Sequence, residues 1–142
     1  MMQKPAKALF LKMYTTWCHN AISTLGLCLI TGAYKHGARI VAELCHVELT
    51  VPMLVQLDKL IHMVESAPLT YMRLQLLEPL AYPHLYKCLY GILMILPQST
   101  MWGRLRDRLT AAGGSNWLGP VWAQPFPNTP PLSLSLLLLF VV

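Results

Sequence analysis

The sequence has 142 residues, of which 55% are hydrophobic and 12% are charged. A charged fraction of about half the usual quarter excludes an intrinsically disordered polyampholyte. The net charge of +5 does not require a nucleic-acid partner. The length predicts at most one domain, and all 11 basic and all 6 acidic residues lie at or before Arg108. We therefore expect a helical domain over residues 1–112 and a separate uncharged tail over residues 113–142.

A series of short helices is predicted over the first 112 residues. Apolar residues recur at helical spacing, and no alternating β-branched pattern or hairpin signal is present. The predicted starts follow one another at steps of about 14 to 18 residues, near Ala6, Asn20, Tyr34, Val51, Leu69, Pro83 and Thr100. This spacing suggests short antiparallel helices stacked in an all-α, HEAT-like α-solenoid array, although an irregular helical bundle would give a similar pattern.

Polar residues and glycine mark several helix ends. Asn20 is expected to cap the helix Ala21–Thr31, and Gly32 is expected to end it. Ser99 is the expected cap of the last helix. Between them, the spacing of apolar residues predicts a helix over Leu69–Glu78.

The predicted helix Leu85–Leu96 is apolar on nearly every side. Its leucine stripe consists of Leu85, Leu89, Ile92, Leu93 and Leu96, and a second face consists of Tyr86, Tyr90 and Met94. Such a helix is buried on all sides within a protein, or is covered by a partner. We predict that the leucine stripe packs within the protomer. We predict that Tyr86, Tyr90 and Met94 meet a partner subunit.

Three arginines lie together in the last predicted helix. Arg104 and Arg108 are four residues apart and therefore share a face, with Arg106 and Asp107 between them. A solvated helix end explains this pattern, because the helix dipole favours basic side chains there. A docking site for an acidic partner or an anionic lipid explains it as well, so Arg104 and Arg108 are candidate interface residues.

No motif for catalysis, for a metal or for a cofactor is present. The residues of Cys18-His19 and of Cys45-His46 are adjacent, whereas zinc ligand pairs usually lie two to four residues apart. The sequence has no P-loop, no GxGxxG and no HExxH. We therefore predict no enzyme, no metal and no cofactor. Unpaired cysteines and the lack of a recognisable signal peptide favour a cytosolic setting.

The predicted tail is of low complexity and is expected to be disordered. Its last eleven residues, Leu132–Val142, are apolar except for two serines. A spanning helix needs about 20 apolar residues, so this segment alone does not predict a transmembrane protein. It is expected to lie at a membrane interface, to pack on the helical part, or to be unrelated sequence appended to the domain. The abrupt change of composition favours the last interpretation.

Several short segments together resemble one known family. They are Trp17-Cys18-His19-Asn20, Leu74-Gln75-Leu76-Leu77, Leu89-Tyr90-Gly91-Ile92-Leu93-Met94-Ile95-Leu96-Pro97-Gln98-Ser99 and Arg108-Leu109. As a set they are similar to the C-terminal region of the ArPIKfyve family, the vacuole-morphology scaffold of the phosphatidylinositol 3-phosphate 5-kinase complex. The resemblance covers roughly Leu9 to Leu109. Because that family has a long run of helical repeats before this region, we expect the sequence to be a fragment or isoform.

The resemblance implies a non-catalytic, all-helical scaffold. Such a scaffold holds the lipid kinase and an opposing Sac-type phosphatase together, associates with itself, and controls phosphatidylinositol 3,5-bisphosphate. It is cytoplasmic and peripheral on endosomal or vacuolar membranes, and it binds no nucleic acid. The alternative is a small peripheral membrane protein that uses Arg104, Arg106 and Arg108 with Leu132–Val142 against an anionic bilayer.

Overall fold

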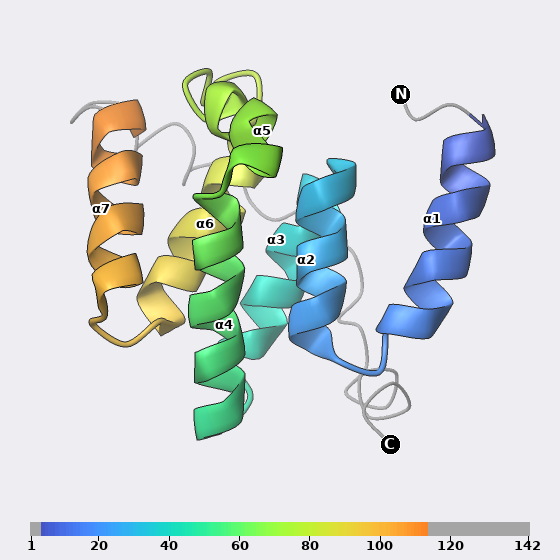
Figure 1. Cartoon of the computed structure of the whole chain (residues 1–142), viewed down its shortest axis with the longest axis horizontal. Coiled ribbons are helices and arrows are strands. Elements are labelled where there is room, and N and C mark those ends of the chain that lie inside the picture. Colours follow the sequence, from blue (N-terminus) through green and yellow to red (C-terminus); the bar gives the residue numbers. More distant parts are fainter. Residues whose placement is uncertain (1–3, 114–142) are drawn as a thin grey trace.

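The computed structural model of the chain describes residues 4–113 (Figure 1). This part is entirely helical and contains no strand. Its helices are α1 (Lys4–Trp17), α2 (Ala21–Thr31), α3 (Tyr34–Leu44), α4 (Val51–Val64), the 3-10 turn η1 (Ala67–Leu69), α5 (Thr70–Gln75), α6 (Pro83–Ile95) and α7 (Thr100–Gly113). The predicted all-α class is confirmed for the described residues, whereas the predicted disorder of the tail falls on residues outside them.

The helices stack in two layers of opposite direction. Helices α2, α4 and α7 run one way, and α1, α3 and α6 run the other (Figure 1). Helix α4 packs against both α2 and α7, and α3 packs against α6. Helix α2 also packs on α3, and α6 on α7, which joins the two layers. Parallel neighbours within a layer and antiparallel partners between layers are the arrangement of stacked helical pairs.

The end signals in the sequence act as predicted at two helices. The Asn20 side chain accepts hydrogen bonds from the backbone N–H groups of Ile22 and Ser23, at 2.9 and 3.2 Å. Gly32 ends α2 with a φ of 77°, the left-handed conformation that glycine adopts without strain. The Ser99 hydroxyl accepts a hydrogen bond from the backbone N–H of Trp102 and so caps α7.

The predicted helix Leu69–Glu78 is shorter in the structure. Helix α5 stops at Gln75, and the chain continues through tight turns in which the N–H of Leu77 donates to Leu74 and that of Glu78 to Gln75. Pro79 lacks an N–H and disfavours the α conformation of the residue before it. An apolar stripe alone did not account for this stop signal.

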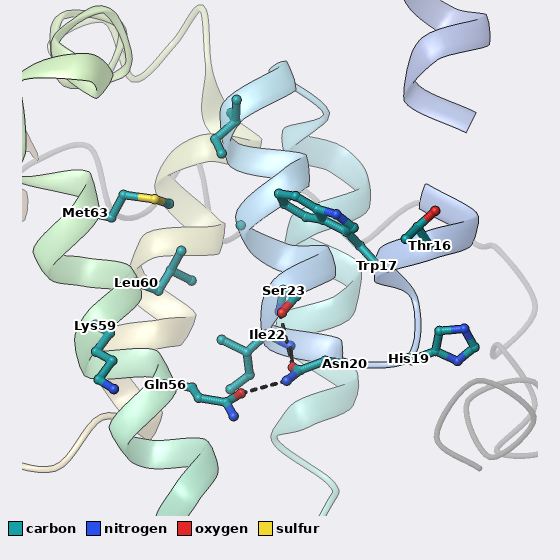
Figure 2. Close-up of a pocket in the computed structure, with 12 residues that line it drawn as sticks. Thr16, Trp17, His19, Asn20, Ile22, Ser23, Gln56, Lys59, Leu60 and Met63 are labelled. Atoms are coloured by element: carbon teal, nitrogen blue, oxygen red, sulfur yellow. Dashed lines mark hydrogen bonds between the residues drawn. The ribbon is translucent and has the colours of Figure 1, made fainter. Parts of the chain in front are cut away.

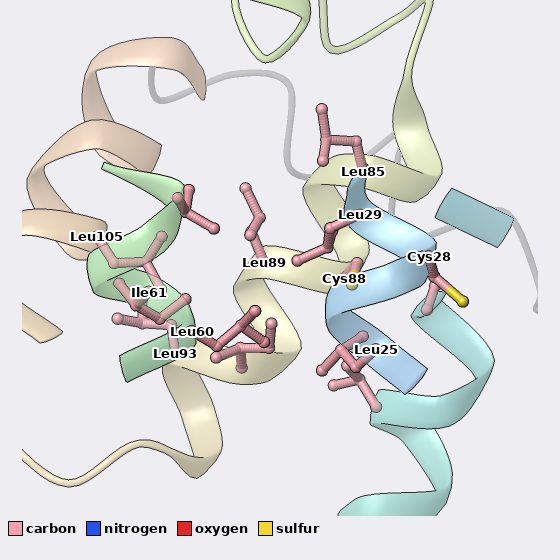
Figure 3. Packing of buried hydrophobic residues seen from close by; sticks show 14 of the residues in the cluster. Leu25, Cys28, Leu29, Leu60, Ile61, Leu85, Cys88, Leu89, Leu93 and Leu105 are labelled. Atoms are coloured by element: carbon pink, nitrogen blue, oxygen red, sulfur yellow. The ribbon is translucent and has the colours of Figure 1, made fainter. Parts of the chain in front are cut away.

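The hydrophobic core lies between the layers. Figure 3 shows leucines of α2, α6 and α7 meeting Ile61 of α4. The leucine stripe of α6 is buried, as predicted, with Leu85 and Ile92 at 0% exposure. Two free thiols belong to this core, and burial raises the pKa of Cys28 to about 12 and raises that of Cys88 as well. They are therefore small buried hydrophobic side chains, as predicted.

Candidate interaction surface

A groove runs along the outer side of the layer formed by α2 and α4. It has a volume of about 540 Å³. Trp17, at the end of α1, lies over α2, and Leu60 and Met63 face it from α4 (Figure 2). Gly26 forms part of the floor, because a Cβ atom there would lie 3.3 Å from the Cδ1 atom of Leu60. The groove exists because α2 presents a glycine where its neighbours present long side chains.

One end of the groove is polar and fixed by hydrogen bonds. The Asn20 amide that caps α2 also donates to the side-chain oxygen of Gln56, at 2.9 Å (Figure 2). The Thr24 hydroxyl donates to the backbone oxygen of Trp17, at 3.0 Å, and so ties the end of α1 to α2. Lys59 is the one fully charged side chain among the described lining residues, and none of them is a carboxylate. The groove is therefore apolar with a weakly basic rim.

Two large apolar side chains in the groove are exposed. Trp17 is 37% exposed and Ile30 is 41% exposed. Exposed aromatic and branched side chains grouped around a concave surface are typical of a protein-docking site, since such side chains supply most of the binding energy when they are buried. The groove is thus the best-formed candidate for binding a partner in the described part of the chain.

Helix α1 forms one wall of the groove and is held mainly by its second half. The Tyr14 hydroxyl and the Nε2 atom of His36 on α3 are 3.0 Å apart and hydrogen-bonded. The two rings also pack, with centroids 5.5 Å apart, and Phe10 stacks next to Tyr14. Burial and the nearby Arg39 lower the pKa of His36. The neutral ring therefore accepts the tyrosine proton.

The predicted Tyr86–Tyr90–Met94 face is graded from buried to exposed. Tyr86 is 3% exposed and belongs to the core, and its ring stacks on that of Tyr90 with centroids 6.2 Å apart. Tyr90 is half-buried, whereas Met94 is 69% exposed. The structure therefore keeps Tyr86 inside the chain and leaves Met94 as the accessible end of this face. Whether the face meets a subunit stays a prediction.

The arginine stripe of α7 is not a uniform basic surface. Both Arg108 nitrogens Nε and Nη2 donate to the carboxylate of Glu65 at the end of α4, at 2.6 and 2.5 Å. Arg106 pairs with Asp107 and lies 5.1 Å above the ring of Trp102. Arg104 is exposed. Because Arg108 joins two helices, Arg104 is the more accessible of the two predicted interface arginines.

The two Cys-His pairs do not come together. Cys18 is buried and Cys45 is exposed. Across residues 4–113, no three His, Cys, Asp or Glu side chains are grouped so that they would hold a metal ion. None of the helices described is both long and apolar enough to cross a bilayer.

Comparison with known proteins identifies the family. A family model matches residues 1–112, and its description is the C-terminal region of vacuolar protein 14 that binds a phosphatase of the Sac type. The chain belongs to the Vac14 family. ArPIKfyve is the mammalian Vac14, so the resemblance found in the sequence is confirmed. No solved structure matches the chain significantly.

Three Vac14 relatives show how much of the family protein this chain represents. It is 52% identical over 101 residues to a Vac14 homologue of Schizosaccharomyces pombe. It is 46% identical over 110 residues to the Arabidopsis thaliana homologue, and 42% identical over 102 residues to vacuole morphology and inheritance protein 14 of Saccharomyces cerevisiae. These matches cover 71% to 77% of this chain but only 12% to 15% of the relatives.

Sequence reasoning did not find the groove. The residues from Trp17 to Asn20 stand out in the sequence only through their resemblance to the family, and Lys59 fits the pattern of a solvated helix face. The signal was Gly26, a glycine in the middle of a predicted helix, where a glycine often marks a close approach or a hollow. Its neighbours across the groove lie more than 30 positions away and are not predictable from local spacing.

Proposed function

We propose that this chain is the phosphatase-docking segment of a non-catalytic Vac14-type scaffold. The observation that carries the proposal is the match of residues 1–112 to a family described by its binding of a Sac-type phosphatase. In the scaffold implied by the resemblance, this phosphatase is held beside the opposing lipid kinase. The role of the segment is therefore to control phosphatidylinositol 3,5-bisphosphate by position and not by chemistry.

The groove between α2 and α4 is the site we assign to the phosphatase. An apolar groove with an aromatic side chain at one end suits the apolar face of a partner helix. A volume of about 540 Å³ is enough for several side chains of such a helix. Lys59 at the rim and the lack of a carboxylate among the described lining residues favour an acidic residue beside the apolar ones.

Kinase contact, self-association and peripheral attachment to endosomal or vacuolar membranes complete the proposed role. These properties come from the family resemblance. The exposed apolar side chains outside the groove, Met94 among them, support further contacts of this kind, because a folded monomer seldom leaves many such side chains in water without a partner.

Capture of the Sac-type phosphatase by the full chain tests the proposal. Ser23 is exposed and lines the groove, so Ser23→Arg places a long charged side chain in the groove without disturbing the core. We expect this variant to lose at least about tenfold in affinity, since one such hot-spot contact is worth about 2 kcal/mol. The matched control is Thr110→Arg, an exposed position on α7 away from the groove, which should bind normally.

The outcomes separate the function from the site. If the unaltered chain does not capture the phosphatase, the proposed function is wrong. If it does so and Ser23→Arg binds equally well, the function stands and the groove is the wrong site. Circular dichroism of both variants establishes that a loss of capture is not a loss of fold.

A further inference from the structure

A second exposed surface lies at the end of the molecule opposite the turn between α1 and α2. The segment consists of α5 and the turn after it, residues 70–82, and is called here the α5 hook. Four large apolar side chains project from it into solvent: Tyr71 at 41% exposure, Leu74 at 61%, Leu77 at 63% and Leu80 at 79%. In Figure 1 the hook forms the upper edge of the molecule, beside the upper ends of α2 and α7.

The hook is firmly attached, so its exposed leucines are not the result of loose packing. Met72 and Leu76 point inward and are 1% and 2% exposed. The Tyr71 hydroxyl donates to the backbone oxygen of Ile30, at 2.6 Å. One Arg73 nitrogen donates to the backbone oxygens of Val64 and Ser66, at 2.8 and 2.5 Å. With one face of the hook fixed to the core, the opposite face has to carry its leucines outward.

Basic side chains border the hook. The first residue of α3, Tyr34, hydrogen-bonds to Gln75 of the hook and packs against Tyr82, with ring centroids 6.4 Å apart. The next residue, Lys35, is exposed. Burial, and then Lys87 and Lys35, lower the pKa of His84, which places these two lysines near the start of α6.

The charge balance at this edge is positive. Arg73, Lys35 and Lys87 are the fully charged basic residues of the hook and its borders, and Glu78 is the one acidic residue between positions 70 and 87. Arg73 uses its donors on backbone oxygens, which leaves its charge in place. Lys87 is 5% exposed, so Lys35 is the lysine that a partner would meet directly. The leucines therefore project from a basic surrounding that contains a single carboxylate.

We propose that the α5 hook is a contact site for an anionic lipid bilayer. Leucines that are 61% to 79% exposed stand on a protrusion and not in a groove. A protein partner would need a cavity matched to each of them, whereas a bilayer accepts a protruding side chain at any point of its surface. Lys35 lies where anionic headgroups would meet it. Tyr71 has the ring and hydroxyl that suit the boundary between headgroups and acyl chains.

This contact is weak by nature and depends on charge. A few leucines and basic residues give reversible attachment, which becomes firm only when a second contact, such as the rest of a scaffold complex, is present. Added salt screens the basic side chains from the headgroups. The contact differs from the one expected from the arginines of α7, because Arg108 is paired with Glu65.

Co-sedimentation of the full chain with phosphatidylcholine vesicles, with and without phosphatidylserine, tests the inference. We expect binding to the vesicles that contain phosphatidylserine and a strong decrease in binding at high salt. The double variant Leu77→Ser and Leu80→Ser should reduce the partition coefficient on the order of tenfold or more, because two apolar side chains no longer insert. Since both leucines are exposed, the fold should survive, and thermal melting checks this.

Two further variants address charge, and a matched pair serves as control. Lys35→Glu should reduce binding by about fivefold or more, and Glu78→Gln should increase it, because each alters the charge next to the headgroups. The control is Leu9→Ser with Leu11→Ser on α1, where the side chains are 60% and 53% exposed. This pair removes the same kind of surface elsewhere and keeps the rest of the chain, tail included, unchanged.

Each outcome decides the matter. Binding that follows phosphatidylserine and is lost only in the hook variants supports the inference. The inference is overturned if the unaltered chain binds neither kind of vesicle, if the hook variants bind normally, or if the control pair loses binding equally. A hook variant that loses phosphatase capture, with no vesicle binding by the unaltered chain, would identify the hook as a protein site. Because the vesicles contain no phosphatase, failure here leaves the proposed function standing.

Discussion

At the scale of single residues, one absent methyl group decides how closely α3 and α6 approach. A Cβ atom on Gly91 would lie 2.5 Å from the Cγ1 atom of Val41, a distance at which one of the two helices has to move. Val41 is 2% exposed and β-branched, so its side chain has little freedom to turn away. We expect Gly91→Ala to destabilise the fold by about 1–3 kcal/mol, measured by urea unfolding.

The control uses the same substitution in another helix. Gly103 in α7 has no atom within 4 Å of an added Cβ, so Gly103→Ala should stabilise by up to about 1 kcal/mol through helix propensity alone. Val41→Ala combined with Gly91→Ala should recover part of the lost stability. If Gly91→Ala proves as stabilising as Gly103→Ala, the close crossing of α3 and α6 is wrong.

At the scale of elements, the helices that the sequence predicted are those whose ends carry a chemical signal. Asn20 and Gly32 bound α2, and Ser99 caps α7, because these residues act on the backbone next to them. Contacts between elements had no such local signal. The sequence places Arg108 among docking residues because its partner Glu65 lies 43 positions earlier, and it places Tyr86 on an interface because a stripe does not reveal which neighbour covers it.

The contact between α1 and α3 gives the fold a pH dependence. His36 has a folded-state pKa below its ordinary value of about 6.5, from burial and then from Arg39. The folded state therefore takes up its proton at lower pH than the unfolded state does. Stability is complete above about pH 6.5 and decreases as pH falls from there towards the folded-state pKa. Protonation also reverses the donor at the Tyr14 hydrogen bond.

Thermal melting between about pH 7.5 and about pH 5.5 measures this effect. We expect the melting temperature of the unaltered chain to decrease on acidification, and His36→Gln to flatten the decrease. His62→Gln, on an exposed position of α4, is the control and should keep the full pH dependence. His84, whose pKa is also lowered by burial and by Lys87 and Lys35, contributes in the same direction. An equal slope in the His36 and His62 variants would contradict the assignment to His36.

At the scale of the whole molecule, stacked helical pairs leave several faces for partners. The groove lies on the layer of α2 and α4, the α5 hook lies at one end, and Met94 projects from α6. The sequence predicted the stacking, because helix spacing reflects the pairs. It did not predict the faces, because exposure depends on which helices happen to cover each stripe. The family resemblance supplied the partners, and the structure supplies separate surfaces on which each partner can be tested.

Self-association through the exposed end of α6 is the prediction that needs the whole molecule. Met94 is 69% exposed, so Met94→Glu should leave helicity and melting unchanged yet reduce the mass measured by light scattering. Tyr90→Glu is a poorer probe, because Tyr90 stacks on the buried Tyr86 and a charge there disturbs the core. Leu9→Glu, at 60% exposure on α1, is the matched control and should keep the mass. A mass unchanged by Met94→Glu would move the contact between copies to another face.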